Sequence, residues 1–145
     1  MDRLSKQQRS WNMSRIRNRD TQPEKTVRSV LHRMGYRFRV NQAGLLGKPD
    51  IVLRKYRTVV FVHGCFWHRH NGCRYAYNPK SRKLFWKNKF EYNTRHDELV
   101  RRGLVHDGWH VVIIWECQVS DVDHLKGKLT SRLQSAKRNS KSRQY

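Results

Sequence analysis

Two thiols and two imidazoles lie within the nine residues from Cys65 to Cys73, shortly after a strongly apolar run. The third cysteine, Cys117, lies far away along the chain. Structural zinc sites take four sulfur and nitrogen ligands, and short loops supply several of them. The sequence therefore predicts a closed zinc site made by Cys65, His70, Cys73 and Cys117. Such a site requires a fold that brings residue 117 beside the loop, as two adjacent strands with neighbouring ends would do.

Two alternatives stay open within this cluster. His68 competes with His70 as the nitrogen ligand, and Cys117 as a free thiol would be an ordinary buried apolar residue. Three cysteines cannot all pair with one another, so a disulfide framework is disfavoured and a reducing, cytosolic location fits better. Four ligands also leave one histidine and the adjacent aromatic residues Phe66 and Trp67 without a structural task. Function is therefore expected in these remaining side chains.

The charge balance indicates a nucleic-acid partner. The chain of 145 residues carries 32 lysines and arginines against 11 aspartates and glutamates, a formal net charge of +21. Basic side chains release counterions from a phosphate backbone, whereas the alternative is a merely solvated basic surface. A membrane partner is disfavoured, because no segment combines a basic face with a strongly apolar one. The length is that of one domain with a real core.

Hydrophobic periodicity predicts an α/β fold. A helix is expected to begin at Thr21, with a capping box closed by Glu24, and to end near Gly35. Further helical patterns cover 80–102, in two pieces, and a last stretch that opens at Asp121. Four strands are expected, at 36–40, 50–54, 58–62 and 110–115. A short link makes the second and third strands an antiparallel hairpin, so the whole indicates a mixed central β-sheet flanked by helices.

The chain divides into one domain with two extensions. Residues 1–20 are polar and basic and bury too little to fold alone, so they are predicted to form a partly helical arm that lies on the partner. Residues 21–134 are predicted to form the single domain, and 135–145 a basic, disordered tail. The first residues show no apolar core of a signal peptide.

Two carboxylates suggest a hard-metal site. Asp50 follows Pro49 and opens the predicted hairpin, and Glu24 lies in the helix before it. A helical glutamate followed by Pro-Asp at a hairpin suggests the PD-(D/E)xK nuclease architecture, in which carboxylates hold Mg²⁺ against a scissile phosphate. The next strand ends at Val62 and His63 without a further carboxylate or lysine, so a backbone carbonyl or an imidazole would have to substitute. The alternative is that Asp50 only caps a turn.

Several short motifs then extend the pattern over most of the chain. They are Ser10-Trp11-Asn12-Met13, Arg19-Asp20-Thr21 with Glu24, Gly47-Lys48-Pro49-Asp50, Val62-His63-Gly64-Cys65-Phe66-Trp67-His68, Phe85-Trp86-Lys87 and Trp115-Glu116-Cys117. In this order and spacing the chain closely resembles the very-short-patch-repair (Vsr) DNA mismatch endonucleases. The resemblance covers roughly residues 8 to 118 and includes all three cysteines.

The resemblance implies a magnesium-dependent enzyme that nicks one strand of duplex DNA 5′ to the thymine of a T·G mismatch, which arises when 5-methylcytosine deaminates. Asp50 matches the family's metal-binding aspartate, and the main-chain carbonyl of Val62 matches a second ligand. His68 matches the general base, and Asp97 matches the acidic partner that orients it. Two further positions match residues near the reaction centre, Glu24 and His63.

The resemblance assigns recognition to aromatic side chains. Taken alone, Phe66 and Trp67 would fit a core, but the family match implies that they wedge, with Trp86, into the base stack beside the mismatch. Met13 in the arm matches a residue that enters from the opposite groove. Such wedges cost a few kcal/mol of unstacking per step, and less at a mismatch. The ligand loop is one residue longer than in histidine-rich relatives, which leaves the choice of the histidine ligand open.

The expected cofactors are thus a catalytic Mg²⁺ and a structural Zn²⁺. The expected partner is double-stranded DNA with a T·G mismatch, with mismatch-repair proteins as further candidates. A monomer in the bacterial cytoplasm, associated with the nucleoid, is expected. Two other functions stay in competition: a sequence-specific nicking or restriction endonuclease that ignores mismatches, and a non-catalytic zinc DNA-binding protein.

Overall fold

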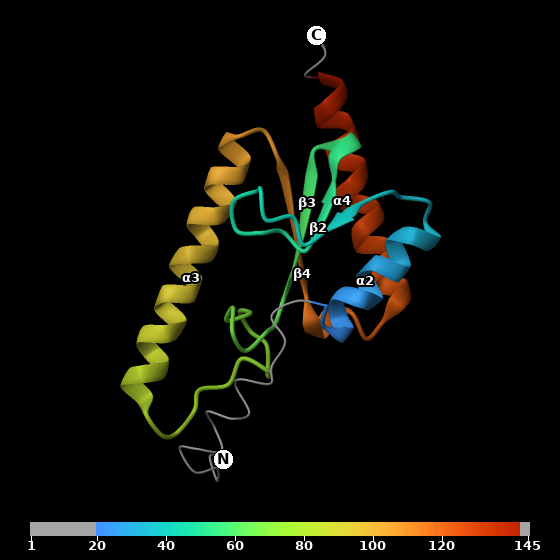
Figure 1. Cartoon of the computed structure of the whole chain (residues 1–145). Coiled ribbons are helices and arrows are strands. Elements are labelled where there is room, and N and C mark those ends of the chain that lie inside the picture. Colours follow the sequence, from blue (N-terminus) through green and yellow to red (C-terminus); the bar gives the residue numbers. More distant parts are fainter. Residues whose placement is uncertain (1–19, 143–145) are drawn as a thin grey trace.

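The computed structural model describes residues 20–142, so Met13 and nearly all of the arm predicted for residues 1–20 lie outside the described residues. Figure 1 shows the arrangement of the described elements, a mixed sheet with helices on both sides. In chain order these elements are α2 (Gln22–Arg33), β1 (Arg39–Val40), β2 (Ile51–Leu53), η1 (Arg54–Tyr56), β3 (Thr58–His63), α3 (Lys83–His106), β4 (His110–Trp115), η2 (Glu116–Gln118) and α4 (Val122–Ser142). The predicted α/β architecture is confirmed.

The sheet has the strand order β1-β2-β3-β4. β1 and β2 pair antiparallel, and so do β2 and β3, which confirms the predicted hairpin. β3 and β4 pair in parallel, with Thr58 opposite His110 at one end and His63 opposite Trp115 at the other. The carboxyl ends of these two strands therefore meet at one edge of the sheet. The loop after β3 and the η2 turn after β4 start side by side.

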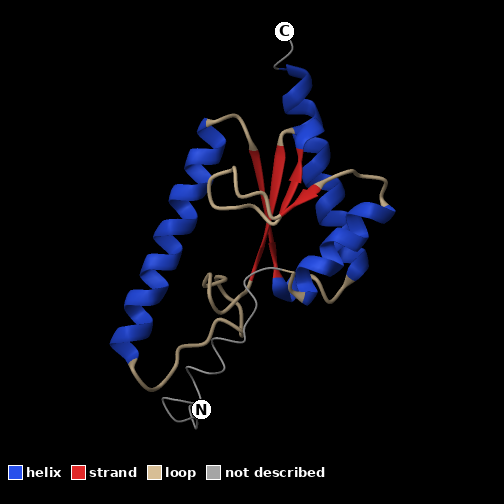
Figure 2. Cartoon of the chain, in the orientation of Figure 1, coloured by secondary structure: helices blue, strands red, loops and turns tan. Residues whose placement is uncertain are grey.

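The helices cover opposite faces of the sheet. α3 lies on one face, and α2 and α4 lie on the other (Figures 1 and 2). Successive strand residues point to opposite faces, so Val60 packs with α2 and α4 whereas Val59 and Phe61 pack with α3. The α3 side of the core is completed by Val100 and Leu104. None of the helices in the described part of the chain is long and apolar enough to cross a membrane.

The ends of α2 follow the sequence signals with one difference. The Thr21 hydroxyl accepts a hydrogen bond from the Glu24 N–H at 3.4 Å, as an N-cap should. The Glu24 carboxylate does not close the predicted capping box, because it accepts the N–H of Asp20 at 2.7 Å instead. At the other end Gly35 has a φ of 88°, and the Tyr36 N–H donates to the Leu31 carbonyl. This is the glycine-dependent helix end that the sequence predicts.

Two predicted helices are longer than expected. α3 is one continuous helix of 24 residues, not two pieces ending before Gly103. Gly103 lies within the helix, where a Cβ would meet only the end of the half-exposed Leu46 side chain. The glycine therefore does not end the helix. α4 continues to Ser142, so it extends well into the segment 135–145 for which the sequence predicts disorder.

The strand predicted at 36–40 pairs with the sheet only at Arg39 and Val40. The alternation that suggested a strand has another cause. Tyr36 and Phe38 are partly buried against the core between α2 and the sheet, whereas Arg37 is exposed. The segment is thus extended and packed on one side before it joins β2.

Candidate active site

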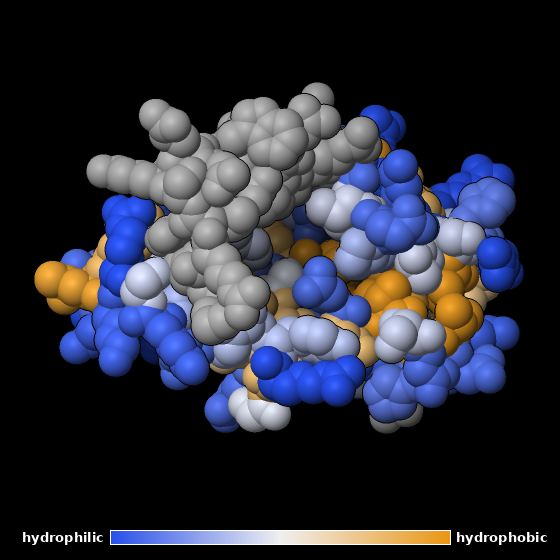
Figure 3. All heavy atoms as spheres, turned by 90° about the horizontal axis from the view of Figure 1, so that it is seen from below, coloured by the Kyte–Doolittle hydropathy of each residue, from blue (hydrophilic) through white to orange (hydrophobic). Residues whose placement is uncertain are grey.

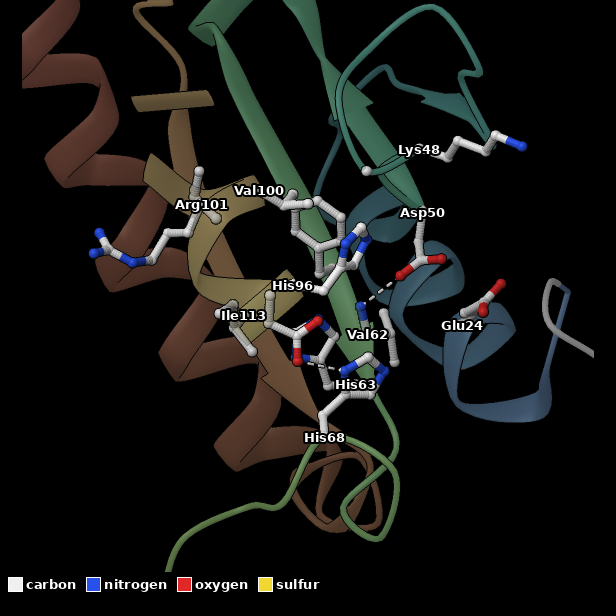
Figure 4. A pocket seen from close by; sticks show the side chains of 14 residues that line it. Glu24, Lys48, Asp50, Val62, His63, His68, His96, Val100, Arg101 and Ile113 are labelled. Carbon is white, nitrogen blue, oxygen red and sulfur yellow. Dashed lines mark hydrogen bonds and ion pairs between the residues drawn. The ribbon is translucent and has the colours of Figure 1, made fainter. Parts of the chain in front are cut away.

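Carboxylates and imidazoles from four parts of the fold line one cavity of about 320 Å³. The cavity lies at the edge where β2 begins and β3 ends, and α2 and α3 close it from opposite sides (Figure 4). Its titratable lining includes Glu24, Asp50, His63, His68, His96 and Asp97. Because β2 and β3 are antiparallel, the residue before β2 and the last residues of β3 are neighbours. The hairpin therefore carries the predicted Asp50, Val62 and His63 to one place.

Asp50 is held by the backbone of β3. Its Oδ2 accepts the Val62 N–H at 2.7 Å, a bond drawn in Figure 4. Burial raises the pKa of Asp50 from its ordinary value of 3.8 to about 7, and the nearby Glu24 carboxylate acts in the same direction. The Val62 N–H, Arg28 and His68 act in the opposite direction. The carboxylate thus lies where negative charge is poorly compensated by the protein.

Glu24 faces the same space from α2 and is 3% exposed. Its Oε2 accepts a hydrogen bond from the Asp20 N–H and a second one from Nη2 of Arg28 at 3.4 Å. Arg28 also contacts the Asp20 carboxylate at 2.9 Å, and that carboxylate accepts from the Asn41 amide at 3.1 Å. This network fixes Glu24 beside Asp50. Two carboxylates with oxygen donors in a partly closed space are what a hard divalent cation takes from a protein.

His68 and Asp97 form a close pair on the other side of the cavity. Nδ1 of His68, in the loop after β3, lies 2.7 Å from Oδ2 of Asp97 on α3. The His68 ring stacks on the His63 ring with a centroid distance of 3.8 Å and an interplanar angle of 7°. Burial lowers the pKa of His63 to about 4, so this ring is neutral near pH 7. The carboxylate fixes the tautomer of His68, and His63 supports its ring from one side.

These three residues lie close enough to suggest a metal site, since their ligand atoms fall within 4.8 Å of one another. The stacking argues against such a site. The lone pair of an imidazole nitrogen lies in the ring plane, so two parallel rings direct their lone pairs side by side and not toward one ion. The arrangement suits proton transfer by His68 better than chelation.

The predicted zinc ligands meet below the sheet edge. The ligand atoms of Cys65, His70, Cys73 and Cys117 all lie within 4.8 Å of one another. Nδ1 of His70 is 3.7 Å from the Cys65 Sγ and 3.4 Å from the Cys117 Sγ. Cys117 is in η2, which the parallel pairing of β3 and β4 brings beside the loop. Three sulfurs and one imidazole nitrogen fit a four-ligand structural zinc site.

The geometry separates the two competing histidines. His70 lies among the cysteines, whereas His68 lies against Asp97. Burial raises the pKa of the fully buried Cys65 to about 12, so binding of a cation there would have to release the thiol proton.

A column of rings joins the cysteine cluster to the His68–Asp97 pair. His70 stacks on Trp115 with a centroid distance of 4.3 Å and an angle of 9°. Trp115 meets His63 edge to face at 5.3 Å, and His63 stacks on His68. We call these four side chains, His70, Trp115, His63 and His68, the ring column. The two sites are thus in contact through packed side chains.

Phe66 is the centre of an aromatic cluster between the loop and α3. Its ring lies 5.1 Å from Trp67, 5.4 Å from Trp86 and 5.2 Å from Phe90, measured between centroids. Trp86 is 9% exposed and Phe90 8%, whereas Phe66 and Trp67 are partly exposed. The three predicted wedge residues therefore lie together, with Trp86 behind the other two. Figure 3 shows the molecule from below the view of Figure 1, with hydrophobic side chains exposed among hydrophilic ones.

The cavity is also lined by residues to which the sequence assigned no role. His96 and Arg101 of α3 and Lys48 of the 41–50 loop line it. Arg101 is four residues from Asp97, so helical spacing from the predicted Asp97 is a signal that could have found it. Lys48 belongs to the Gly47-Lys48-Pro49-Asp50 motif, so its closeness to Asp50 in the sequence was a signal. His96 has no such signal, because its position depends on how α3 crosses the sheet.

Comparison with known proteins identifies the family of this chain. The sequence model of the family described as DNA mismatch endonuclease Vsr matches residues 1–74. The type II nicking enzyme V.XorIIP of Xanthomonas oryzae pv. oryzae is 46% identical over 132 residues, which are 91% of this chain and 96% of the relative. The DNA mismatch endonuclease Vsr of Escherichia coli is 42% identical over 127 residues, 87% of this chain and 81% of the relative. The chain therefore belongs to the Vsr family and is a DNA endonuclease.

Proposed function

We propose that this protein nicks one strand of duplex DNA 5′ to the thymine of a T·G mismatch, using a nuclease core of the PD-(D/E)xK type. The observation that carries the proposal is the cavity in which Asp50 and Glu24 face the His68–Asp97 pair, beside a loop that exposes aromatic rings. Phosphodiester hydrolysis needs oxygen ligands for a hard cation and a base for water. The two sides of the cavity offer these two functions.

The carboxylate side fits Mg²⁺ by its donor chemistry. The raised pKa of Asp50 reflects buried negative charge beside Glu24, and a divalent cation would compensate this charge. Asp50 would hold the ion together with the main-chain carbonyl of Val62, with Glu24 close by. When bound, Mg²⁺ would stabilise the negative charge that develops on the phosphoryl and leaving oxygens.

His68 is proposed as the general base. An ionised Asp97 carboxylate can only accept a hydrogen bond, so the proton between the two groups belongs to Nδ1 of His68. In the neutral His68 ring this leaves Nε2 without a proton and able to accept one. Water that attacks the phosphate would lose its proton to this Nε2. His63 is proposed to hold the His68 ring by stacking, and its lowered pKa keeps it from adding a second positive charge.

Replacing Asp97 by asparagine is expected to slow single-turnover nicking by about a hundredfold or more, the range of a lost general base. The asparagine amide can donate to Nδ1, which favours the tautomer with the proton on Nε2. Asp107 offers a matched control, since it forms an exposed pair with His106 at 3.4 Å. Asp107→Asn should nick at the wild-type rate. Equal rates for both variants would remove Asp97 from the mechanism.

The aromatic loop is proposed to recognise the mismatch. Phe66 and Trp67 would enter the base stack, where a mismatch lowers the cost of unstacking. Trp86 would follow them or support them from behind. A structural Zn²⁺ on Cys65, His70, Cys73 and Cys117 would fix the loop between its two cysteines. The proposed site of action is the bacterial cytoplasm, where the protein would bind DNA as a monomer.

A second function is favoured by the names of several relatives. V.XorIIP and V.NmeAIP, the latter from Neisseria meningitidis and 41% identical over 120 residues, are type II nicking enzymes. This chain would then nick a particular sequence with or without a mismatch. The two functions differ in what they require of the substrate, so one experiment separates them.

The experiment is a panel of end-labelled duplexes that differ only at one base pair and its neighbours. T·G, C·G and T·A versions of each sequence are incubated with and without Mg²⁺, and the nicked ends are mapped. The proposal predicts nicks only in T·G duplexes, only on the thymine strand, at its 5′ side, and only with the cation. Equal nicking of matched and mismatched versions would favour the second function. Binding without any nick would leave a non-catalytic zinc DNA-binding protein.

A further inference from the structure

Arg69 ties the loop to itself and to α3. Its Nη1 donates to the carbonyl of Tyr77 at 2.9 Å and to that of Phe66 at 3.4 Å. Its Nη2 donates to the Ala76 carbonyl at 3.0 Å and to the Asn78 Oδ1 at 2.7 Å. One side chain thus joins the start of the loop to residues at its far end. The planar guanidinium can serve several fixed acceptors at once, which an ammonium cannot.

The guanidinium also lies on the aromatic cluster. Its carbon is 3.9 Å from the centroid of the Phe90 ring on α3 and 5.8 Å from that of Phe66. Asn93, on the same helix, donates to the Trp67 carbonyl at 3.0 Å. A cation placed over the face of an aromatic ring is attracted to it. Arg69 is therefore layered between the loop backbone and the helix that backs Phe66.

In a chain with a net charge of +21, most basic side chains are candidates for phosphate contacts. The contacts of Arg69 distinguish it from these. Both terminal nitrogens are engaged by main-chain and side-chain acceptors of the protein itself. Its backbone has a φ of 56°, in the left-handed region that non-glycine residues rarely occupy. Such a conformation persists only where surrounding contacts hold it. The side chain is thus engaged in shaping the loop and is not available to a phosphate.

We propose that Arg69 is a positioning residue that holds the segment 66–78 on α3, so that Phe66 and Trp67 are already in place when DNA arrives. The effect of Arg69 on DNA binding rests on the proposed function, in which these two rings enter the base stack. A loop that is ordered in advance avoids the entropy cost of ordering during binding. Loss of the clamp should weaken the step in which the rings insert and leave general attraction to phosphate unchanged.

Arg69→Lys tests the clamp in the free protein. The variant keeps the charge and the backbone restriction but cannot bridge four acceptors. Arg74→Lys is the matched control, because Arg74 lies in the same loop and its guanidinium contacts its immediate neighbour Tyr75. We expect faster amide hydrogen exchange across 66–78 in Arg69→Lys, with zinc content and exchange in the sheet unchanged. Exchange equal to that of Arg74→Lys would overturn the proposal.

The same two proteins then bind mismatched and matched duplexes. For Arg69→Lys we expect the affinity for the T·G duplex to fall about tenfold, with matched-duplex affinity and its salt dependence unchanged. The KM for nicking should rise more than kcat falls. Asn78→Ala, which removes one acceptor, should act in the same direction and less strongly. Equal losses on both duplexes would overturn the proposal, because they would identify Arg69 as a phosphate contact.

The two readouts separate this inference from the proposed function. If the wild-type protein does not distinguish T·G from matched DNA, the proposed function fails, and hydrogen exchange still decides whether Arg69 orders the loop. If the wild type distinguishes them and Arg69→Lys does so equally well, only the clamp is wrong. If Arg69→Lys does not fold, Asn78→Ala decides by the same two measurements.

Discussion

Replacing Asp50 by asparagine is expected to abolish nicking of a mismatched duplex while leaving its binding almost unchanged. Asparagine keeps an oxygen that can accept the Val62 N–H, the bond that now measures 2.7 Å, but it lacks the charge that a hard cation requires. Nicking should fall by about a thousandfold or more, the scale of losing a group that compensates transition-state charge. Binding depends mainly on phosphate contacts and should persist. Single-turnover nicking and equilibrium binding at one salt concentration measure both.

The control for this variant is Asp123→Asn, at an exposed position in the first turn of α4. It removes the same charge from the protein far from the cavity and should nick normally. An Asp50→Asn protein that nicks at close to the wild-type rate would contradict the assignment of Asp50 to the cation site. Loss of binding together with nicking would instead indicate that Asp50 has a structural role.

In the absence of Mg²⁺, the Asp50→Asn variant should become more stable relative to the wild type as the pH rises. The pKa of Asp50 is raised from 3.8 to about 7 in the folded protein, so the folded state binds the proton more tightly than the unfolded state. This contribution to stability is fully present below about pH 4 and is lost as the pH rises through about 7. The asparagine side chain of the variant is neutral throughout. The melting temperature of Asp50→Asn should therefore rise relative to that of the wild type from about pH 4 to about pH 7, and the difference should stay constant above that range.

A constant difference between the two melting temperatures across this pH range would show that Asp50 is not perturbed by burial. The lowered pKa of His63 also makes stability depend on pH, with the opposite sign. His63 is present in both proteins, so its contribution largely cancels in the comparison. Added Mg²⁺ should raise the melting temperature of the wild type and not that of the variant, because binding to the folded state alone stabilises it.

Replacing Cys117 by serine is expected to cost zinc and folding stability together. Cys117 is the only member of its cluster outside the loop, and it joins that loop to the end of β4. Structural zinc contributes about 10–16 kcal/mol to the folding of small zinc-finger peptides, so the loss of one ligand should lower the free energy of unfolding by several kcal/mol. Metal analysis of the purified protein and thermal unfolding measure the two effects.

Glu116→Gln is the matched control, since Glu116 is the exposed neighbour of Cys117 in the same turn. It should keep its zinc and unfold like the wild type. A Cys117→Ser protein that retains one zinc per chain and normal stability would exclude Cys117 as a ligand. In that case Cys117 would be a free, partly exposed thiol.

The sequence predicted the frame of this site because local patterns determine it. The unbroken β-branched run of β3 and the Pro-Asp before β2 predicted the hairpin that brings Asp50 beside Val62, and the resemblance to the Vsr family implied their roles. The two runs of apolar strand residues also suggested that their ends meet, which brings Cys117 to the loop. These inferences need only strand periodicity and the direction of short connections.

Contacts that depend on the exact path of a loop or on packing between elements could not be predicted in this way. The acceptor pattern of Arg69 depends on the exact path of the loop, and the bond between Glu24 and the Asp20 N–H depends on a left-handed residue before the helix. Gly103 indicated a helix end, but α3 continues through it to His106, packed on the sheet through Val100 and Leu104. Side-chain geometry between distant elements is set by packing, and the sequence pattern does not specify it.

The ring column has a consequence for exchanging parts between relatives. Trp115 contacts His70 on one side and His63 on the other, so the residue at this position sets the spacing between the cysteine cluster and the His68–Asp97 pair. A loop transplanted from a relative without its own counterpart of Trp115 is expected to be displaced relative to the ends of β3 and β4. The smallest unit that can be moved as one piece is therefore the loop, the end of β3 and the end of β4 together.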